Sequence, residues 1–93
     1  MKDALVVRIL TIKNRKGLHA RASAKLVQLA ATFKSQITVA RDGTKVVGTS
    51  IMGLLMLAAA PGCTIEVEAK GPDARQALDA IERLVDARFD EAE

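Results

Sequence analysis

The chain has 93 residues, of which 49% are hydrophobic and 2% aromatic, and its net charge is +3. A chain this short closes one modest core, so we expect a single domain over residues 1–93. Its one cysteine, Cys63, excludes an internal disulfide. The longest nearly continuous apolar stretch, residues 51–60, is shorter than the roughly 20 residues that span a bilayer, and the start lacks a secretory signal. We therefore expect a cytoplasmic protein without membrane insertion.

Basic and acidic residues are distributed unevenly along the chain. No acidic residue lies between Asp3 and Asp42, a stretch that is rich in lysine and arginine, whereas most of the acids follow residue 65. If the fold keeps these regions apart, the molecule is electrically polar. Its positive face would attract acidic proteins, phosphate groups or nucleic acid.

The first half of the chain predicts a strand, a helix and a hairpin. Residues 4–12 are rich in β-branched side chains and predict a strand that ends in a polar loop. Apolar residues at three- and four-residue steps predict a helix over residues 20–32. Residues 35–40 and 45–48 predict two strands, because Asp42 and Gly43 between them readily adopt the positive φ angles of a tight turn.

The second half predicts a helix, a strand and a helix. Ser50 is placed to cap a short helix over residues 51–57, which Pro61 and Gly62 stop. Alternation over residues 64–69 predicts a strand with one wet face. The last helix follows Asp73 and carries Phe89 on its apolar face, and we expect the acidic tail, residues 90–93, to be solvated. The order β-α-β-β-α-β-α predicts an α+β fold with a four-stranded antiparallel sheet and three helices on one face.

The only histidine, His19, stands between Gly17 and the predicted start of the first helix. The unpaired N–H groups and positive dipole end of a helix start favour a phosphate there, and Arg21 adds a formal charge. A neutral imidazole leaves one ring nitrogen free to attack phosphorus. His19 is therefore a candidate nucleophile for phosphoryl transfer, although a lone histidine at this position is more often a cap or a surface residue.

Two motifs resemble those of a known family. The segment G-L-H-A-R-A at 17–22 looks like the active-site signature of the histidine-containing phosphocarrier proteins (HPr) of the bacterial phosphotransferase system, and S-I-M-G-L-L-M-L at 50–57 looks like their regulatory segment. The resemblance covers essentially the whole chain and implies an open-faced β-sandwich. One position departs from the family, because Ala22 stands where proline is common; we expect altered rates but retained function.

The resemblance also implies the roles of particular residues. Enzyme I, drawing on phosphoenolpyruvate, would phosphorylate Nδ1 of His19, and Ala20 and Arg21 would hold the phosphate. A histidine of an enzyme IIA component would receive it, so the protein is a carrier and not an enzyme, and it needs no cofactor or metal. In relatives an HPr kinase/phosphorylase acts on the serine at the position of Ser50.

A docking surface is expected beside His19. Residues 51–57 are too apolar for a short helix to bury them all, so some face outward and suit adaptable binding to several partners. The resemblance points to Ile51, Met52 and Leu55, and Lys25 belongs to the basic residues around them. We expect a monomer in solution.

Two alternatives remain open. The calculated pI near 9.4 also fits a basic module that binds nucleic acid or a small anion, although stacking aromatic residues are scarce. Within the family, the carrier could serve a nitrogen- or carbon-regulatory relay in place of sugar uptake. A near-match to a phosphate-binding loop at 43–50 fails, because Thr49 stands where that motif requires lysine.

Overall fold

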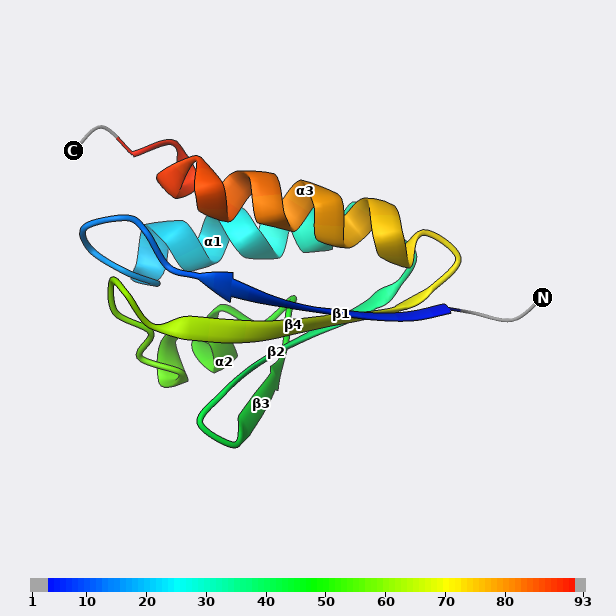
Figure 1. The fold of residues 1–93 in the computed structure, drawn as a ribbon, viewed down its shortest axis with the longest axis horizontal. Coiled ribbons are helices and arrows are strands. Elements are labelled where there is room, and N and C mark those ends of the chain that lie inside the picture. The colour runs from blue at the N-terminus through cyan, green and yellow to red at the C-terminus, as the bar shows by residue number, and fades with distance from the viewer. Residues whose placement is uncertain (1–3, 92–93) are drawn as a thin grey trace.

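A computed structural model describes residues 4–91 and contains one four-stranded sheet (Figure 1). Its strands are β1 (Ala4–Thr11), β2 (Gln36–Arg41), β3 (Thr44–Val47) and β4 (Thr64–Gly71). They lie in the order β1-β4-β2-β3, and every neighbouring pair is antiparallel. The expected sheet is therefore confirmed.

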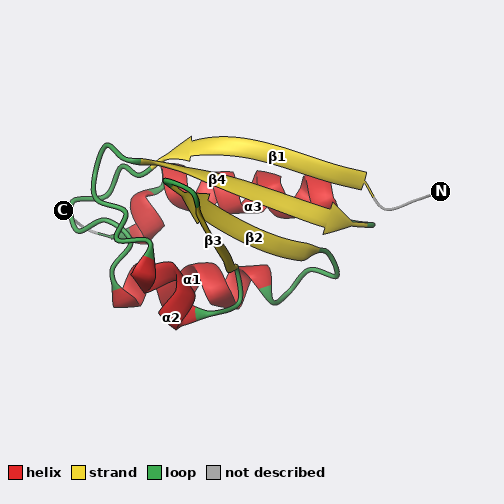
Figure 2. Ribbon diagram, turned by 90° about the horizontal axis from the view of Figure 1, so that it is seen from below, coloured by secondary structure: helices red, strands yellow, loops and turns green. Residues whose placement is uncertain are grey.

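Three helices accompany this sheet. They are α1 (Ala20–Ala30), α2 (Ile51–Met56) and α3 (Ala74–Asp86), and a 3-10 turn, η1 (Arg88–Asp90), follows α3. Figures 1 and 2 show α1 and α3 side by side on one face of the sheet. The short α2 contacts α1 and β3 at one edge of this layer. The predicted α+β, open-faced arrangement is confirmed, and none of the helices within residues 4–91 is long and apolar enough to cross a bilayer.

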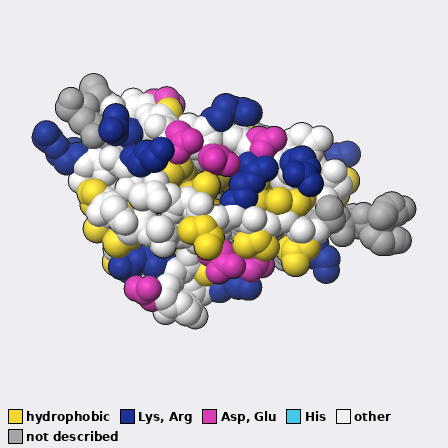
Figure 3. All heavy atoms as spheres, in the orientation of Figure 1, with side chains coloured by type: hydrophobic (Ala, Val, Ile, Leu, Met, Phe, Trp, Pro, Cys, Tyr) yellow, Lys and Arg dark blue, Asp and Glu magenta, His cyan; other side chains and the backbone are white. Residues whose placement is uncertain are grey.

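The core lies between the sheet and the helices, and the periodicity of each element places its apolar side chains there. In β4, Ile65, Val67 and Ala69 are at most 1% exposed, as the alternation predicted. Leu26 of α1 and Ile81 of α3 are fully buried in the same core cluster. The other face of the sheet stays open, and hydrophobic side chains are visible along β1 in Figure 3.

Local backbone geometry explains where the elements end. Asp42 and Gly43 have φ values of 50° and 84°, which are the positive angles expected of the hairpin turn. The α1 helix ends at Ala30, two residues earlier than predicted, and the hydroxyl of Thr32 donates to the carbonyl of Leu29. The α2 helix ends before Pro61 is reached, because Ala58 takes a left-handed φ of 50°.

The expected separation of charge does not occur along the whole molecule. The α3 helix lies against β1, so acids from the second half of the chain meet bases from the first. The guanidinium of Arg8 lies 2.6 Å from Asp79 and 2.9 Å from Glu82, and Lys13 lies 2.8 Å from Asp86. Acidic and basic side chains are accordingly mixed over α3 in Figure 3. Four basic side chains, Arg15, Lys16, Arg21 and Lys25, still gather around His19.

A carboxylate, Asp73, ties the start of α3 to the segment between α1 and β2. Its oxygens accept from the hydroxyl of Ser35 at 2.5 Å and from the backbone N–H groups of Lys34 and Ser35 at 2.8 and 2.9 Å. The hydroxyl of Ser35 is the main reason that the pKa of Asp73 lies below its usual value, with the backbone donors adding to the effect and burial opposing it.

This lowered pKa predicts a pH-dependent stability. The folded pKa is below the unfolded one, so the stabilisation is complete above the unfolded value, about 3.9, and is lost as the pH falls through the folded value. Urea unfolding at several pH values should show Asp73→Asn less stable than the wild type at pH 7, with the difference shrinking in acid. A difference that stays constant down to pH 2 would contradict this assignment.

Candidate functional site

His19 is the N-cap of α1. Its backbone is extended, with φ −80° and ψ −176°, while its carbonyl accepts the first helical hydrogen bond from the N–H of Ser23 at 2.8 Å. Its Nδ1 accepts from the backbone N–H of Arg21 at 3.3 Å. The imidazole thus takes the place that a serine or aspartate side chain fills at other helix starts. The ring lies beside the positive end of the helix dipole, and its side chain is 27% exposed.

The loop before His19 is fixed against the loop that follows α2. Gly17 has a φ of +68°, and a Cβ built on it would lie 2.5 Å from the carbonyl oxygen of Ala59. The next N–H, that of Leu18, donates to this same oxygen at 2.9 Å. Only glycine fits such a close approach in a left-handed conformation. The approach therefore sets where His19 enters α1.

An open hollow surrounds His19 and is rich in basic side chains. Its lining consists of Arg15, Lys16, His19, Ala20, Arg21, Lys25, Asp90 and Glu91. The predicted phosphate-holding residues, Ala20 and Arg21, are both exposed in this hollow. The ammonium of Lys25 donates to the carbonyl of Phe89 at 2.7 Å, so this predicted partner-binding residue also holds the C-terminal turn.

A carboxylate near the C-terminus reaches His19, and sequence reasoning missed it. One oxygen of Glu91 forms a short contact with Nε2 of His19, and the other accepts from the side-chain amide of Asn14 at 3.0 Å. The acidic tail, residues 90–93, was expected to be solvated. For Glu91 that prediction is wrong, because its side chain is only 14% exposed, while residues 92 and 93 lie outside the described range.

The environment of Glu91 favours its charged form. Burial of the carboxyl raises its pKa, but hydrogen bonds from Asn14 and His19, together with the charge of Lys16 and that of His19 when the ring is protonated, outweigh burial and bring the pKa below its usual value. The side chain is thus an ionised acceptor at neutral pH. No sequence pattern near His19 signals this partner, because 72 residues separate the two.

The α2 helix exposes the side chains that sequence reasoning assigned to docking. Ile51, Met52 and Leu55 are 40%, 71% and 37% exposed, while Leu54 and Leu57 are buried in the core. Some apolar side chains of this segment face outward, as expected; their binding of partners remains a prediction.

Ser50 caps α2 as predicted, because its hydroxyl accepts from the N–H of Gly53 at 3.0 Å. The loop after the C-terminal end of α2 contacts the His19 loop through Ala59. Ser50 caps the other end of this helix. The six residues of α2 make the helix about 9 Å long. The structure therefore places the serine at the far end of the exposed helix from the His19 loop.

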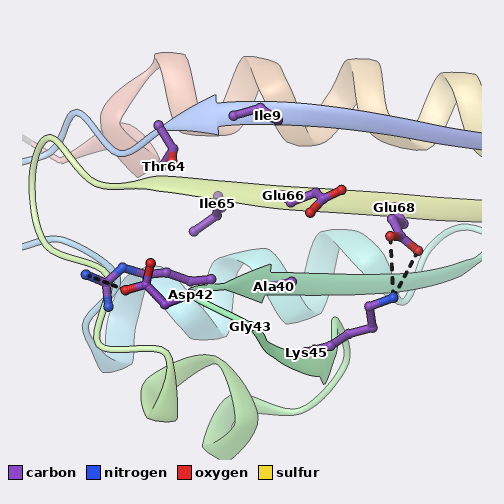
Figure 4. A pocket seen from close by; sticks show the side chains of 10 residues that line it. Ile9, Ala40, Asp42, Gly43, Lys45, Thr64, Ile65, Glu66 and Glu68 are labelled. Carbon is purple, nitrogen blue, oxygen red and sulfur yellow. Dashed lines mark hydrogen bonds and ion pairs between the residues drawn. The ribbon is translucent and has the colours of Figure 1, made fainter.

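A second hollow lies on the open face of the sheet (Figure 4). Its lining consists of Ile9, Ala40, Arg41, Asp42, Gly43, Lys45, Thr64, Ile65, Glu66 and Glu68. Lys45 lies 3.4 Å from Glu68, and Arg41 lies 3.5 Å from Asp42, so most of its charges face a partner of opposite sign. The charges of this hollow are thus largely paired, whereas the hollow around His19 holds a ring nitrogen at a helix start.

Other candidate chemistry has structural explanations. The hydroxyl of Ser23 is buried and donates to the carbonyl of Leu18 at 3.2 Å, so it forms no dyad with His19. The sulfur of Cys63 accepts from Arg41 at 3.3 Å. Within residues 4–91, no group of three or more His, Cys, Asp or Glu side chains is placed to hold a metal ion.

Comparisons with known proteins agree with this geometry. Residues 6–87 match the family model described as the PTS HPr component phosphorylation site. The chain is 53% identical over 83 residues to the phosphocarrier protein HPr of Cupriavidus necator, covering 89% of this chain and 93% of the relative. It is 52% identical over 85 residues to the phosphocarrier protein NPr of Shewanella violacea, covering 91% and 93%.

Solved structures give the same result. The crystal structure of HPr-C-His from Thermoanaerobacter tengcongensis superimposes with a TM-score of 0.90 at 39% identity, covering 95% of this chain and 99% of that one. The fold and the match over most of the sequence agree. The chain therefore belongs to the HPr family of phosphocarrier proteins of the phosphotransferase system.

Proposed function

We propose that the protein is a cytoplasmic, monomeric carrier that accepts a phosphoryl group from enzyme I on Nδ1 of His19 and passes it to a histidine of an enzyme IIA component. The observation that carries this proposal is the position of His19 at the start of α1, with Nδ1 directed to the N–H of Arg21. A phosphoryl group on Nδ1 would replace that weak contact and meet the helix N–H groups.

Charge around the ring supports the same reaction. Lys16, Arg21 and Lys25 line the hollow and would offset the negative charge of a transferring phosphoryl group. The side chain of Arg21 is exposed in this hollow, where its guanidinium could reach a phosphate on His19. The exposed apolar side chains of α2 supply a surface on which enzyme I and enzyme IIA could dock.

The test is phosphorylation of the pure protein by enzyme I and phosphoenolpyruvate. We expect intact mass to show one added phosphoryl group that is labile in acid, nitrogen NMR to place it on Nδ1, and His19→Ala to remain unmodified. Transfer onward to an enzyme IIA component should return the unmodified mass. The absence of phosphate, with an enzyme I that modifies a reference HPr in parallel, would refute the proposal.

Regulation at Ser50 is a further part of the proposal, with an HPr kinase/phosphorylase as the modifying enzyme. Its hydroxyl caps α2 and is half-buried, and phosphate at a helix start is electrostatically favourable. The same modification would place negative charge on the exposed α2 surface. That charge opposes docking by a partner surface that complements basic residues.

The prediction for Ser50 uses two variants that differ by one charge. Asp and Asn both serve as helix N-caps, so α2 should persist in both. We expect Ser50→Asp to raise the KM of enzyme I for this protein about tenfold, equivalent to about 1.4 kcal/mol, and Ser50→Asn to leave it nearly unchanged. Equal kinetics for the two variants would show that charge at residue 50 does not control docking.

The alternatives weighed from the sequence gain no support. Phe89 is fully buried and Phe33 is half-buried, so neither ring is an open platform for stacking a base. The choice between sugar uptake and a regulatory relay is not decided by similarity, since the relatives named HPr and NPr are 53% and 52% identical to this chain. Transfer assays against enzyme IIA components of each branch would decide it.

A further inference from the structure

The two ring nitrogens of His19 face different partners. Nδ1 faces the backbone N–H of Arg21, and Nε2 faces the carboxylate of Glu91. We propose that Glu91 is a positioning residue, which keeps the proton of the neutral imidazole on Nε2 and so leaves the lone pair of Nδ1 free to attack phosphorus. This inference rests on the proposed function, because it concerns how the same nitrogen is made ready for transfer.

The hydrogen-bond roles of the two partners decide which ring nitrogen carries the proton. A neutral imidazole has one donor and one acceptor nitrogen, and the partner of one nitrogen decides which form is present. An ionised carboxylate only accepts, and a backbone N–H only donates. The proton must then lie on Nε2, facing Glu91, and the lone pair on Nδ1, facing Arg21. Both contacts select the same tautomer.

Asn14 holds the carboxylate in place. Its amide nitrogen donates to Glu91 at 3.0 Å and to the carbonyl of Gly17 at 2.7 Å, and its side chain is fully buried. A flipped amide would direct its oxygen at two acceptors, so these two acceptors fix its orientation. Its oxygen is buried without a hydrogen-bond partner among residues 4–91. Asn14 thus links Glu91 to the loop that carries His19.

The turn after α3 brings Glu91 to the ring. Arg88, Phe89 and Asp90 all have left-handed φ values, from 54° to 59°, and none of them is glycine. Such conformations cost about 1–2 kcal/mol per residue. Complete burial of Phe89 and the hydrogen bond from Lys25 to its carbonyl offset this cost. Backbone strain of this kind tends to persist where it positions a functional group.

The transfer step balances with Glu91 in this role. The lone pair of Nδ1 forms the new bond to phosphorus, while the bond from phosphorus to the donor atom of enzyme I breaks and returns its electron pair to that atom. The proton on Nε2 stays where it is, and the ring becomes positively charged. Glu91 offsets that charge, while the bases of the hollow face the phosphoryl group.

The tautomer can be measured without any partner protein, which separates this test from that of the proposed function. Nitrogen-15 NMR of the wild-type imidazole, at a pH where the ring is uncharged, should show a protonated Nε2 and an unprotonated Nδ1. In Glu91→Gln the amide can donate or accept, so we expect the signals to shift toward a mixture of tautomers. A wild-type ring with its proton on Nδ1 would overturn the inference.

Kinetics supply the second readout. We expect Glu91→Gln to lower the turnover of phosphoryl transfer roughly 10- to 100-fold, by analogy with the loss of a carboxylate that orients a metal-binding histidine, with little change in KM. Asp86→Asn is the matched control, because it also removes one carboxylate from the C-terminal part of the chain, and Asp86 contacts Lys13 instead of His19. Wild-type turnover in a correctly folded Glu91→Gln protein would equally overturn the inference.

Discussion

The Phe89→Ala variant is expected to lose about 3–5 kcal/mol of its free energy of unfolding. The ring is fully buried, although it belongs to the turn after α3 and not to the helix face that the sequence suggested. Its removal leaves a cavity and also frees a backbone segment with three left-handed residues. Because small domains have only about 5–15 kcal/mol of stability in total, this is a large share.

The measurement is urea and thermal unfolding followed by circular dichroism, with Phe33→Ala as the control. Phe33 is the other phenylalanine and is only partly buried, so the same truncation should cost clearly less there. We expect the melting temperature of Phe89→Ala to fall by about 12 °C or more. Equal losses in the two variants would mean that burial of Phe89 does not anchor the turn.

Features that depend on near neighbours in the sequence were predicted well. The alternation of Ile65, Val67 and Ala69 follows from the two-residue period of a strand, and the hairpin follows from Asp42 and Gly43. The helix starts at His19 and Ser50 are likewise local, because a cap bonds to N–H groups two or three residues ahead. Each of these signals lies within one short segment.

Features that depend on distant contacts were not predicted. Glu91 meets His19 across 72 residues and Asn14 across 77, and no spacing along the chain indicates that they converge. The left-handed turn that brings Glu91 there contains no glycine, so the usual sequence signal for positive φ is missing. Burial of the Phe89 side chain stabilises that conformation. This burial depends on residues from several elements, which the local sequence does not reveal.

The distribution of charge on the folded molecule also depends on distant contacts and was not predicted. The sequence separates bases from acids, but the packing of α3 against β1 brings Arg8 to Asp79 and Glu82. Around His19 the bases still outnumber the acids, because Arg15, Lys16, Arg21 and Lys25 line the hollow with Asp90 and Glu91. The fold thus pairs some bases of the first half with distant acids and gathers others at the candidate site.

The Gly17→Ala variant should affect both stability and phosphoryl transfer. A left-handed φ of +68° costs alanine about 1–2 kcal/mol, and its Cβ would lie 2.5 Å from the backbone oxygen of Ala59. Relief of that overlap must move one loop and weaken the bond from Leu18 to the same oxygen. We expect a loss of about 2–4 kcal/mol in the free energy of unfolding.

The effect on transfer should exceed what lost stability explains. His19 follows Gly17 by two residues, so a shift of the loop displaces the nucleophile, and a displacement of about 1 Å can lower a rate about 100-fold. Gly62→Ala is the matched control, because Gly62 has a φ of +89° and nothing within 4 Å of an added Cβ. It carries the same backbone strain without the overlap. Slower transfer by folded Gly17→Ala but not by Gly62→Ala would assign the effect to the close approach at Ala59, whereas equal rates would mean that this approach does not position His19.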